Sequence, residues 1–224
     1  MSPDRRIVLF DLYGVIAHLQ RPGTMAEMAA RCKVPEDAFT TAYLARRAPY
    51  DSAQQSAGEY WQTVLHDLST TADADLIEEL RLTDIDSCSE VDEQMVAYAQ
   101  SLRSVAEVAL LSNIPSDHAD AFQIAQPWLR DLDYLAFSGK INAAKPAAAA
   151  FHHCVDALHA DPVDFLFVDD REENVRAAQE IGMNGHRFTR HEELKTAVET
   201  WLSNYPPALP QFLDARSEIR HAAP

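Results

Sequence analysis

The chain has 224 residues, and its 19 Lys and Arg against 35 Asp and Glu give a formal net charge of −16. This charge argues against a protein that binds nucleic acid or an anionic membrane, because both partners would be repelled and the sequence has no basic patch to offset the repulsion. With 47% hydrophobic and 24% charged residues, the composition is that of a folded globular protein. We expect a small-molecule partner and a monomer or homodimer.

The cysteines and the N-terminus predict a cellular compartment. Cys32, Cys88 and Cys154 are far apart and odd in number, so neither a disulfide framework nor a CxxC motif is available. The first apolar run has only four residues, which is too short for a signal peptide, and no stretch approaches the roughly 20 apolar residues that span a bilayer. We therefore expect reduced thiols and a cytoplasmic protein.

The first predicted element is the strand IVLF at 7–10, and the segment after it is helical throughout. Helical patterns occur near 24–32, 36–47, 56–69 and 73–82, and no convincing strand interrupts them. An all-helical insertion after the first strand of a sheet predicts a helical cap domain over 17–87.

From residue 88 onward, strands and helices alternate. Continuous apolar runs this short predict strands that are buried on both faces, as in a parallel sheet covered by helices. Three such runs are VALL at 108–111, YLAF at 134–137 and FLFV at 165–168, with helices predicted over 115–127 and 171–181, a fifth strand near 185–188 and a last helix over 191–203. Together with 1–16, the segment 88–204 predicts an α/β fold with a doubly wound, mostly parallel, Rossmann-like sheet. The proline-containing segment 205–224 predicts an extended tail.

Polar side chains follow each predicted strand. In an open α/β sheet, ligands bind beyond the carboxyl ends of the strands, so these side chains should converge on one edge. They are Asp11, Ser112 and Asn113, Ser138 with Lys145 soon after it, and the pair Asp169 and Asp170. Clustered carboxylates repel each other unless a cation neutralises them, and oxygen ligands of this kind suit Mg²⁺. A carboxylate beside Mg²⁺ and a lysine can attack phosphorus and form an aspartyl-phosphate.

Four segments carry a resemblance to a known family. FDLYGV, LLSN, SGKINAAKP and FVDDREENVRAAQEIGM resemble the four ordered motifs of the haloacid dehalogenase-like (HAD) hydrolase superfamily, over about residues 5–189. In the helical insertion, RRAPYDSAQQSAGEYW is similar to the pattern of the branch that contains α-D-glucose-1-phosphate phosphatase and the N-terminal phosphatase domain of soluble epoxide hydrolase. LSNIP at 111–115 matches the same branch.

The resemblance implies roles for four residues of the first three motifs. Asp11 would be the nucleophile, and Lys145 would bridge the nucleophile and the phosphate. Ser112 and Asn113 would bind the phosphoryl oxygens. The implied activity is that of a Mg²⁺-dependent phosphatase acting on a small phosphorylated metabolite, with a sugar 1-phosphate among the candidates.

The fourth motif and the first loop would hold the metal. The resemblance implies that Asp170 is the direct Mg²⁺ ligand beside Asp11, with Asp169 as its neighbour. The backbone carbonyl of Tyr13 would be a further ligand, and Asn174 would position the loop.

Tyr13 departs from the family pattern, because most family phosphatases have an acid and base Asp at this position. A tyrosine, with a reference pKa near 10, cannot readily act as the base. Three interpretations follow: a phosphatase for leaving groups that need little protonation, such as sugar anomeric or acyl phosphates; a 2-haloacid dehalogenase, whose first motif is also Asp-x-Tyr-Gly; or a catalytically impaired binding or regulatory protein. Two features argue against the dehalogenase. Val15 stands where these enzymes typically have Thr, and a dehalogenase would have no use for the metal-binding acidic pair Asp169 and Asp170.

We expect structural roles for most of the other candidate residues. Asn142 stands where a Gly often precedes the motif lysine, which should alter only a loop. We expect His152 and His153 to be surface or core residues rather than metal ligands, because adjacent helical positions diverge by roughly 100°. We expect packing roles for Cys154, Tyr60 and Trp61 and solvated side chains for Arg46 and Arg47, and we leave Tyr50 and Asp51 open between a loop and a substrate contact.

Overall fold

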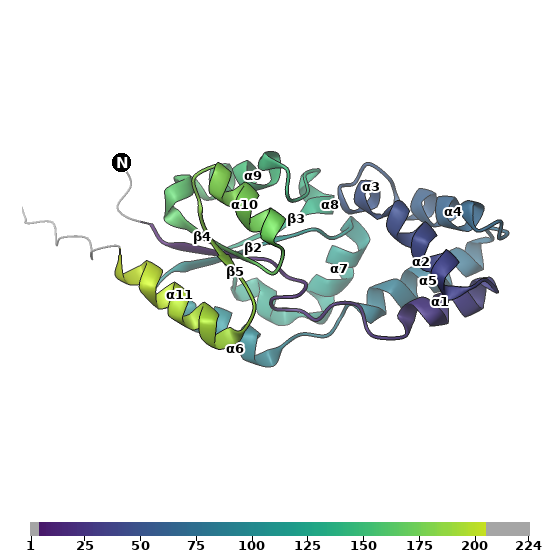
Figure 1. Cartoon of the computed structure of the whole chain (residues 1–224), viewed down its shortest axis with the longest axis horizontal. Helices are drawn as coiled ribbons and strands as arrows, with labels where there is room; N and C mark the ends of the chain where they lie inside the picture. The colour runs from purple at the N-terminus through teal and green to yellow at the C-terminus, as the bar shows by residue number, and fades with distance from the viewer. Residues whose placement is uncertain (1–4, 205–224) are drawn as a thin grey trace, which may run out of the picture.

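The computed structural model describes residues 5–204, so the tail predicted over 205–224 lies outside the described residues. A parallel sheet of five strands in the order β3-β2-β1-β4-β5 forms the centre of one half of the molecule (Figure 1). The strands are β1 (Ile7–Phe10), β2 (Glu107–Ser112), β3 (Tyr134–Phe137), β4 (Phe165–Asp169) and β5 (Asn184–Arg187). The predicted doubly wound α/β fold is confirmed.

Helices cover both faces of this sheet. Val8 and Phe10 of β1 face one apolar cluster, while Ile7 and Leu9 face a second, since successive side chains of a strand point to opposite sides. The first cluster includes side chains of α6 (Glu93–Leu102), α7 (Ser116–Ala125) and α11 (His191–Ser203). The second includes side chains of α9 (Ala148–Leu158) and α10 (Glu172–Glu180). Burial on both faces explains why the strands are continuously apolar.

The remaining helices form a separate body at the other end of the molecule (Figure 1). They are α1 (Thr24–Cys32), α2 (Glu36–Ala45), α3 (Arg47–Asp51), α4 (Ala57–Asp67) and α5 (Ala74–Ser87). Their shared apolar cluster contains Met28, Phe39, Tyr60, Trp61 and Leu80, so the packing roles expected for Tyr60 and Trp61 hold. We call these five helices the cap. Its own core supports the proposed division at residues 17–87, which stays a proposal.

Element boundaries depart from the sequence pattern in the cap. The pattern predicted one helix over 36–47, whereas α2 ends at Ala45 and the short helix α3 follows. The pattern also ended the last cap helix at 82, whereas α5 continues to Ser87. Two short 3₁₀ helices, Pro127–Asp131 and Pro162–Asp164, and the four-residue α8 (Ser138–Ile141) complete the core.

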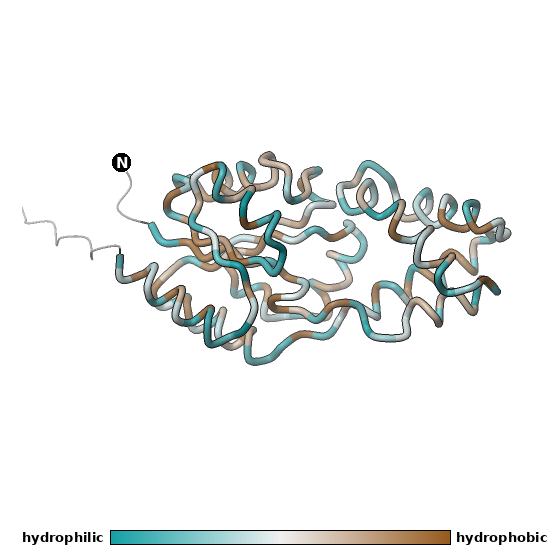
Figure 2. The backbone as a smooth tube through the Cα atoms, viewed as in Figure 1, coloured by the Kyte–Doolittle hydropathy of each residue, from teal (hydrophilic) through white to brown (hydrophobic). Residues whose placement is uncertain are grey.

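Hydrophobic residues run along the central strands and alternate with hydrophilic ones along the surface helices (Figure 2). Between residues 5 and 204, no helix has the length and apolar character needed to span a bilayer.

Candidate active site

Asp11 lies directly after β1, at the point where the chain passes first to β2 on one side and later to β4 on the other. Its backbone N–H donates to the carbonyl of Val168 at 2.8 Å, and its Oδ1 accepts the N–H of Leu12 at 2.7 Å. Only 6% of the residue is exposed. The carboxylate is therefore held in one orientation at the switch point of the sheet, where α/β folds bind their ligands.

Three carboxylates meet at this point. One oxygen each of Asp11, Asp169 and Asp170 lies within 4.8 Å of the others. Asp169 is fully buried, and Asn174 Nδ2 donates to both of its oxygens at 3.1 and 3.0 Å. Asp170 is the more exposed member of the pair, and burial together with the charge of Asp169 raises its pKa. The predicted convergence of the acidic side chains is what the structure shows.

Lys145 supplies a positive charge to this cluster. Its Nζ lies 2.6 Å from Asp11 Oδ1 and 2.7 Å from Asp169 Oδ2, and its side chain is 1% exposed. The lysine is fixed by Asn113, whose Oδ1 accepts the N–H of Lys145 and whose Nδ2 donates to its carbonyl, both at 2.8 Å. The side chain of Asn113 thus holds the backbone of Lys145. The implied contact of Asn113 with phosphoryl oxygens stays a prediction.

The charge of Asp11 is costly where it lies. Burial raises the pKa of Asp11 to about 7, against the attraction of Lys145, and the nearby charge of Asp169 raises it further. An additional cation at the three carboxylates would lower this cost. The arrangement can hold a divalent cation, because it offers hard oxygen ligands and because the single positive charge of Lys145 does not balance the three carboxylates.

The loop after Asp11 shapes the same site. Gly14 has a φ of 85°, and a Cβ there would lie 2.6 Å from Asp170 Oδ2, so a residue without a side chain is needed for this close approach. Asn142, in the position where the family pattern often has Gly, likewise has a positive φ of 55°. Short polar residues tolerate this region better than most others do, which accounts for that departure.

Tyr13 points from this loop toward the cap. Its ring meets Phe122 of α7 edge-on, with the ring centroids 6.1 Å apart. Burial raises the pKa of Tyr13 far above its ordinary value, and Arg47, Asp51 and Asp84 of the cap lie close enough to influence it. Tyr13 therefore stays neutral and cannot replace a carboxylate as a base.

Two serines extend the site. Ser112 is fully buried, and its hydroxyl has no hydrogen-bond partner among the residues that the structure describes. Ser138 Oγ accepts the N–H of Ile114 at 2.8 Å and donates to the backbone carbonyl of Asp51 in the cap. The unpartnered hydroxyl of Ser112 is thus available to a ligand, whereas Ser138 connects core and cap.

The expectation that Arg46 and Arg47 are both solvated is wrong for Arg47. Arg46 pairs with Asp67 at the surface, but Arg47 lies 2.7 Å from the buried Asp84 and 2.9 Å from Asp51. Burial opposes the ionisation of Asp84, yet the Arg47 charge holds its pKa below the usual range. Sequence reasoning missed Asp84, because it lies beyond the helix predicted over 73–82, in an acidic run that carries no local sign of burial.

The cap rests on the first turn of α7. Tyr50 OH donates to Asp117 Oδ1 at 2.6 Å, and Arg81 Nη1 lies 3.1 Å from Asp117 Oδ2. His118 Nε2 lies 3.2 Å from Asp84 Oδ2. Because α7 follows Ser112 and Asn113 after a short loop, these contacts tie the cap to the site. Tyr50 and Asp51, left open from the sequence, are both part of this cap and core contact.

The other candidates behave as structural residues. His153 Nε2 lies 2.7 Å from Tyr134 OH, while His152 is exposed, so the two rings do not share a ligand. Cys154 is fully buried in the core, as expected.

Comparisons with known proteins give both a sequence and a structural match. The sequence model of the haloacid dehalogenase-like hydrolase family matches residues 6–182. A HAD family enzyme of Bacteroides thetaiotaomicron has a similar structure, with a TM-score of 0.74 and 19% identity over 87% of this chain and 98% of that one. The same enzyme in complex with magnesium and inorganic phosphate gives a TM-score of 0.70 and 19% identity over 85% and 98%.

A second kind of enzyme has the same fold. The L-2-haloacid dehalogenase of Xanthobacter autotrophicus with covalently bound chloropropionic acid gives a TM-score of 0.63 and 15% identity, over 88% of this chain and 83% of that one. Identities this low show the shared fold and do not choose between the two reactions.

Proposed function

Since the chain belongs to the haloacid dehalogenase-like hydrolase family, we propose that it is a Mg²⁺-dependent phosphatase that hydrolyses a small phosphorylated metabolite through an aspartyl-phosphate on Asp11. The observation that carries this proposal is the meeting of Asp11, Asp169 and Asp170 within 4.8 Å beside Lys145.

The donor set fits Mg²⁺. Carboxylate and carbonyl oxygens are the ligands that this ion prefers, and three clustered carboxylates against one ammonium leave negative charge to neutralise. Asp11, Asp170 and the backbone carbonyl of Tyr13 would hold the ion, with Asp169 anchored beside them by Asn174 and Lys145. When bound, Mg²⁺ offsets the charge of the carboxylates and of the phosphoryl oxygens. The Bacteroides enzyme, crystallised with magnesium and inorganic phosphate, supports this assignment by analogy.

The chemistry proceeds in two displacements. A carboxylate oxygen of Asp11 attacks phosphorus and forms an O–P bond while the bond to the leaving-group oxygen breaks, and that oxygen departs with the electron pair. Water then attacks the aspartyl-phosphate, which releases inorganic phosphate and restores Asp11. Lys145 and the hydroxyl of Ser112 would hold the phosphoryl oxygens, where charge accumulates in both transition states.

Tyr13 restricts the leaving group. General acid help is worth roughly 10²–10⁴-fold when the leaving group must be protonated, and a tyrosine whose pKa is raised supplies little of it, because it is a weak acid. We therefore propose substrates whose leaving groups depart as stable anions or need little protonation, such as a sugar 1-phosphate or an acyl phosphate.

The second candidate is a 2-haloacid dehalogenase, favoured by the Asp-x-Tyr-Gly motif at Asp11 to Gly14. In that reaction Asp11 would displace halide from carbon, and no leaving-group acid would be needed. The acidic pair Asp169 and Asp170 speaks against it, because it places two carboxylates where an anionic haloacid would have to bind.

The test is a screen for Mg²⁺-dependent phosphate release over sugar phosphates, acyl phosphates and nucleotides, with halide release from L-2-chloropropionate measured in parallel. We expect phosphate release that is lost in Asp11→Asn and on removal of the metal by chelation. Halide release without a metal requirement would establish the dehalogenase instead. If the folded protein has neither activity, the third interpretation, a binding or regulatory protein, would hold.

A further inference from the structure

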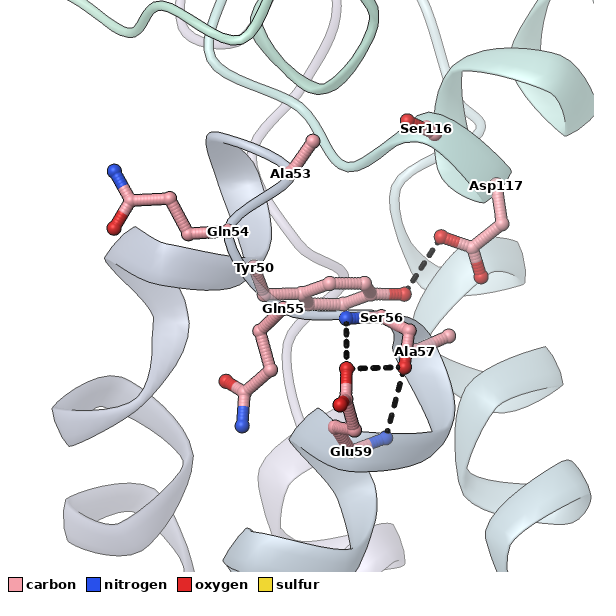
Figure 3. A pocket seen from close by; sticks show the side chains of 9 residues that line it. All are labelled: Tyr50, Ala53, Gln54, Gln55, Ser56, Ala57, Glu59, Ser116 and Asp117. Atoms are coloured by element: carbon pink, nitrogen blue, oxygen red, sulfur yellow. Dashed lines mark hydrogen bonds between the residues drawn. The ribbon is translucent and has the colours of Figure 1, made fainter.

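Two cavities lie between cap and core, and they differ in chemistry. One, of about 490 Å³, is lined by residues between Tyr50 of α3 and Glu59 of α4, among them Gln54, Gln55 and Ser56, together with Ser116 and Asp117 of α7 (Figure 3). In Figure 3, Tyr50 and Asp117 are joined by a hydrogen bond at this cavity, and Ser56 and Glu59 bond to each other. No residue of the Asp11 loop lines this cavity.

The second cavity, of about 390 Å³, is mostly apolar. Five of its nine lining residues have hydrocarbon side chains, contributed by α5 of the cap and α7 of the core: Leu82, Ile85, Ala121, Phe122 and Ala125. Its volume lies in the range of small-molecule sites. The polar members at its wall include Asp86, which is already paired with Arg21 at 3.0 Å. The cavity thus suits an uncharged, apolar group.

Tyr13 connects this cavity to the nucleophile. It lines the apolar cavity and is two residues from Asp11, on the loop that carries the carboxylate. Its ring packs edge-on against Phe122, another wall residue, so the aromatic surface continues from the nucleophile loop into the cavity. The loop that carries the nucleophile therefore reaches the apolar cavity through Tyr13, whereas no residue of that loop lines the other cavity.

We propose that the apolar cavity between α5 and α7 binds the leaving group, so that the substrate class is an aryl phosphate, the phosphate ester of an uncharged aromatic alcohol. This inference rests on the proposed phosphatase function. Asp11 forms the bond to phosphorus, the phosphorus to aryl-oxygen bond breaks, and the phenolate leaves with the electron pair and takes a proton from water.

An aryl leaving group also satisfies the chemistry at the loop. Phenols have a pKa near 10, as the tyrosine side chain shows, so a phenolate departs with little need of an acid. An aromatic ring gains from offset or edge-on contact with Tyr13 and Phe122 beyond the burial of its apolar surface. A sugar, by contrast, would bury hydroxyl groups against hydrocarbon walls without hydrogen-bond partners, which is costly.

The test compares three phosphates and three variants. The substrates are 1-naphthyl phosphate, glucose 1-phosphate and acetyl phosphate, whose acetate leaving group has no ring to fill the cavity. Ala121→Phe narrows the cavity, and Leu82→Gln makes its mouth polar without adding charge. Leu82 is 50% exposed, so this variant should fold, and Leu44→Gln is its control, because Leu44 is a 61% exposed leucine of the cap outside both cavities. Binding of 1-naphthol to the metal-free protein, followed by fluorescence, measures the cavity without catalysis.

We expect kcat/KM for 1-naphthyl phosphate to exceed that for glucose 1-phosphate by tenfold or more. In Ala121→Phe, both this kcat/KM and the affinity for 1-naphthol should fall by tenfold or more, since even one methylene group in a hydrophobic pocket is worth about tenfold. Leu82→Gln should lower the kcat/KM for 1-naphthyl phosphate and the affinity for 1-naphthol about threefold, and Leu44→Gln should lower neither. In Ala121→Phe and Leu82→Gln, hydrolysis of acetyl phosphate should change much less than that of 1-naphthyl phosphate.

The outcomes separate the two proposals. Better turnover of glucose 1-phosphate, with no effect of Ala121→Phe on naphthol binding, would overturn the cavity assignment and leave the phosphatase function intact. Naphthol binding that depends on Ala121 in a protein that hydrolyses none of the three phosphates would overturn the phosphatase function and the aryl phosphate substrate, while the cavity would remain a site for apolar ligands.

Discussion

Replacing Asp11 by asparagine should abolish turnover and, at the same time, make the metal-free protein more stable. The asparagine is nearly isosteric, and its Oδ1 can still accept the N–H of Leu12, as Asp11 does at 2.7 Å. It carries no charge, however, so neither burial nor the charge of Asp169 penalises it. The amide is also a poor nucleophile, which removes the proposed attack on phosphorus.

The size of the effect follows from the pKa of Asp11. Burial raises this pKa from 3.8 to about 7, with the attraction of Lys145 already opposing the rise. Each pH unit between the two values corresponds to about 1.4 kcal/mol, so the ionised carboxylate costs up to about 4 kcal/mol of the free energy of unfolding. A carboxyl group with a raised pKa binds more protons in the folded than in the unfolded state. Its destabilising contribution is therefore absent below about pH 4 and grows as the pH rises toward 7.

The assay is urea denaturation in the presence of a chelator, followed by tryptophan fluorescence. We expect Asp11→Asn to raise the free energy of unfolding by about 3–4 kcal/mol at pH 8 and by about 2 kcal/mol at pH 5. Asp156→Asn, at an exposed carboxylate of α9, is the control and should change it by less than about 0.5 kcal/mol at both pH values. A stabilisation that is absent, or equal at both pH values, would refute the argument that the buried charge of Asp11 is costly.

Three further predictions concern the neighbours of Asp11. Lys145→Met should inactivate the enzyme and lower the free energy of unfolding by about 2 kcal/mol. This is less than a broken buried ion pair usually costs, because Asp11 can take up a proton. The variant should also bind Mg²⁺ more tightly in calorimetry, and an unchanged rate and affinity would contradict the role of Lys145. Gly14→Ala should destabilise the protein by about 1–3 kcal/mol and weaken Mg²⁺ binding through the contact with Asp170, whereas Gly58→Ala, with open space around it on α4, should not destabilise it. Tyr13→Asp should raise hydrolysis of alkyl phosphates by roughly 10²–10⁴-fold and that of anomeric, acyl or aryl phosphates far less, and an equal change on all of them would mean that Tyr13 only fills space.

The fold and the position of the site could be predicted from local patterns. Four continuous apolar runs indicated buried parallel strands, and the fifth strand, at Asn184–Arg187, lies within one residue of its predicted place. Because parallel strands end at the same edge of a sheet, the residues after them had to converge, and Asp11, Lys145, Asp169 and Asp170 do so. The cap helices followed from their apolar periodicity, although the break before α3 left no signal in that pattern.

Contacts between distant segments were decided only by the tertiary structure. Arg47 looked like a surface residue, since a charged side chain on a helix is usually solvated, but it is partly buried and pairs with the buried Asp84, 37 positions away. The amide of Asn113 is occupied by the backbone of Lys145, 32 positions further along the chain. Likewise, the apolar cavity exists because α5 of the cap and α7 of the core pack beside Tyr13. Short-range periodicity and the direction of parallel strands are properties of the sequence itself, whereas pairing and cavity shape depend on how separate elements pack, and no local pattern encodes that.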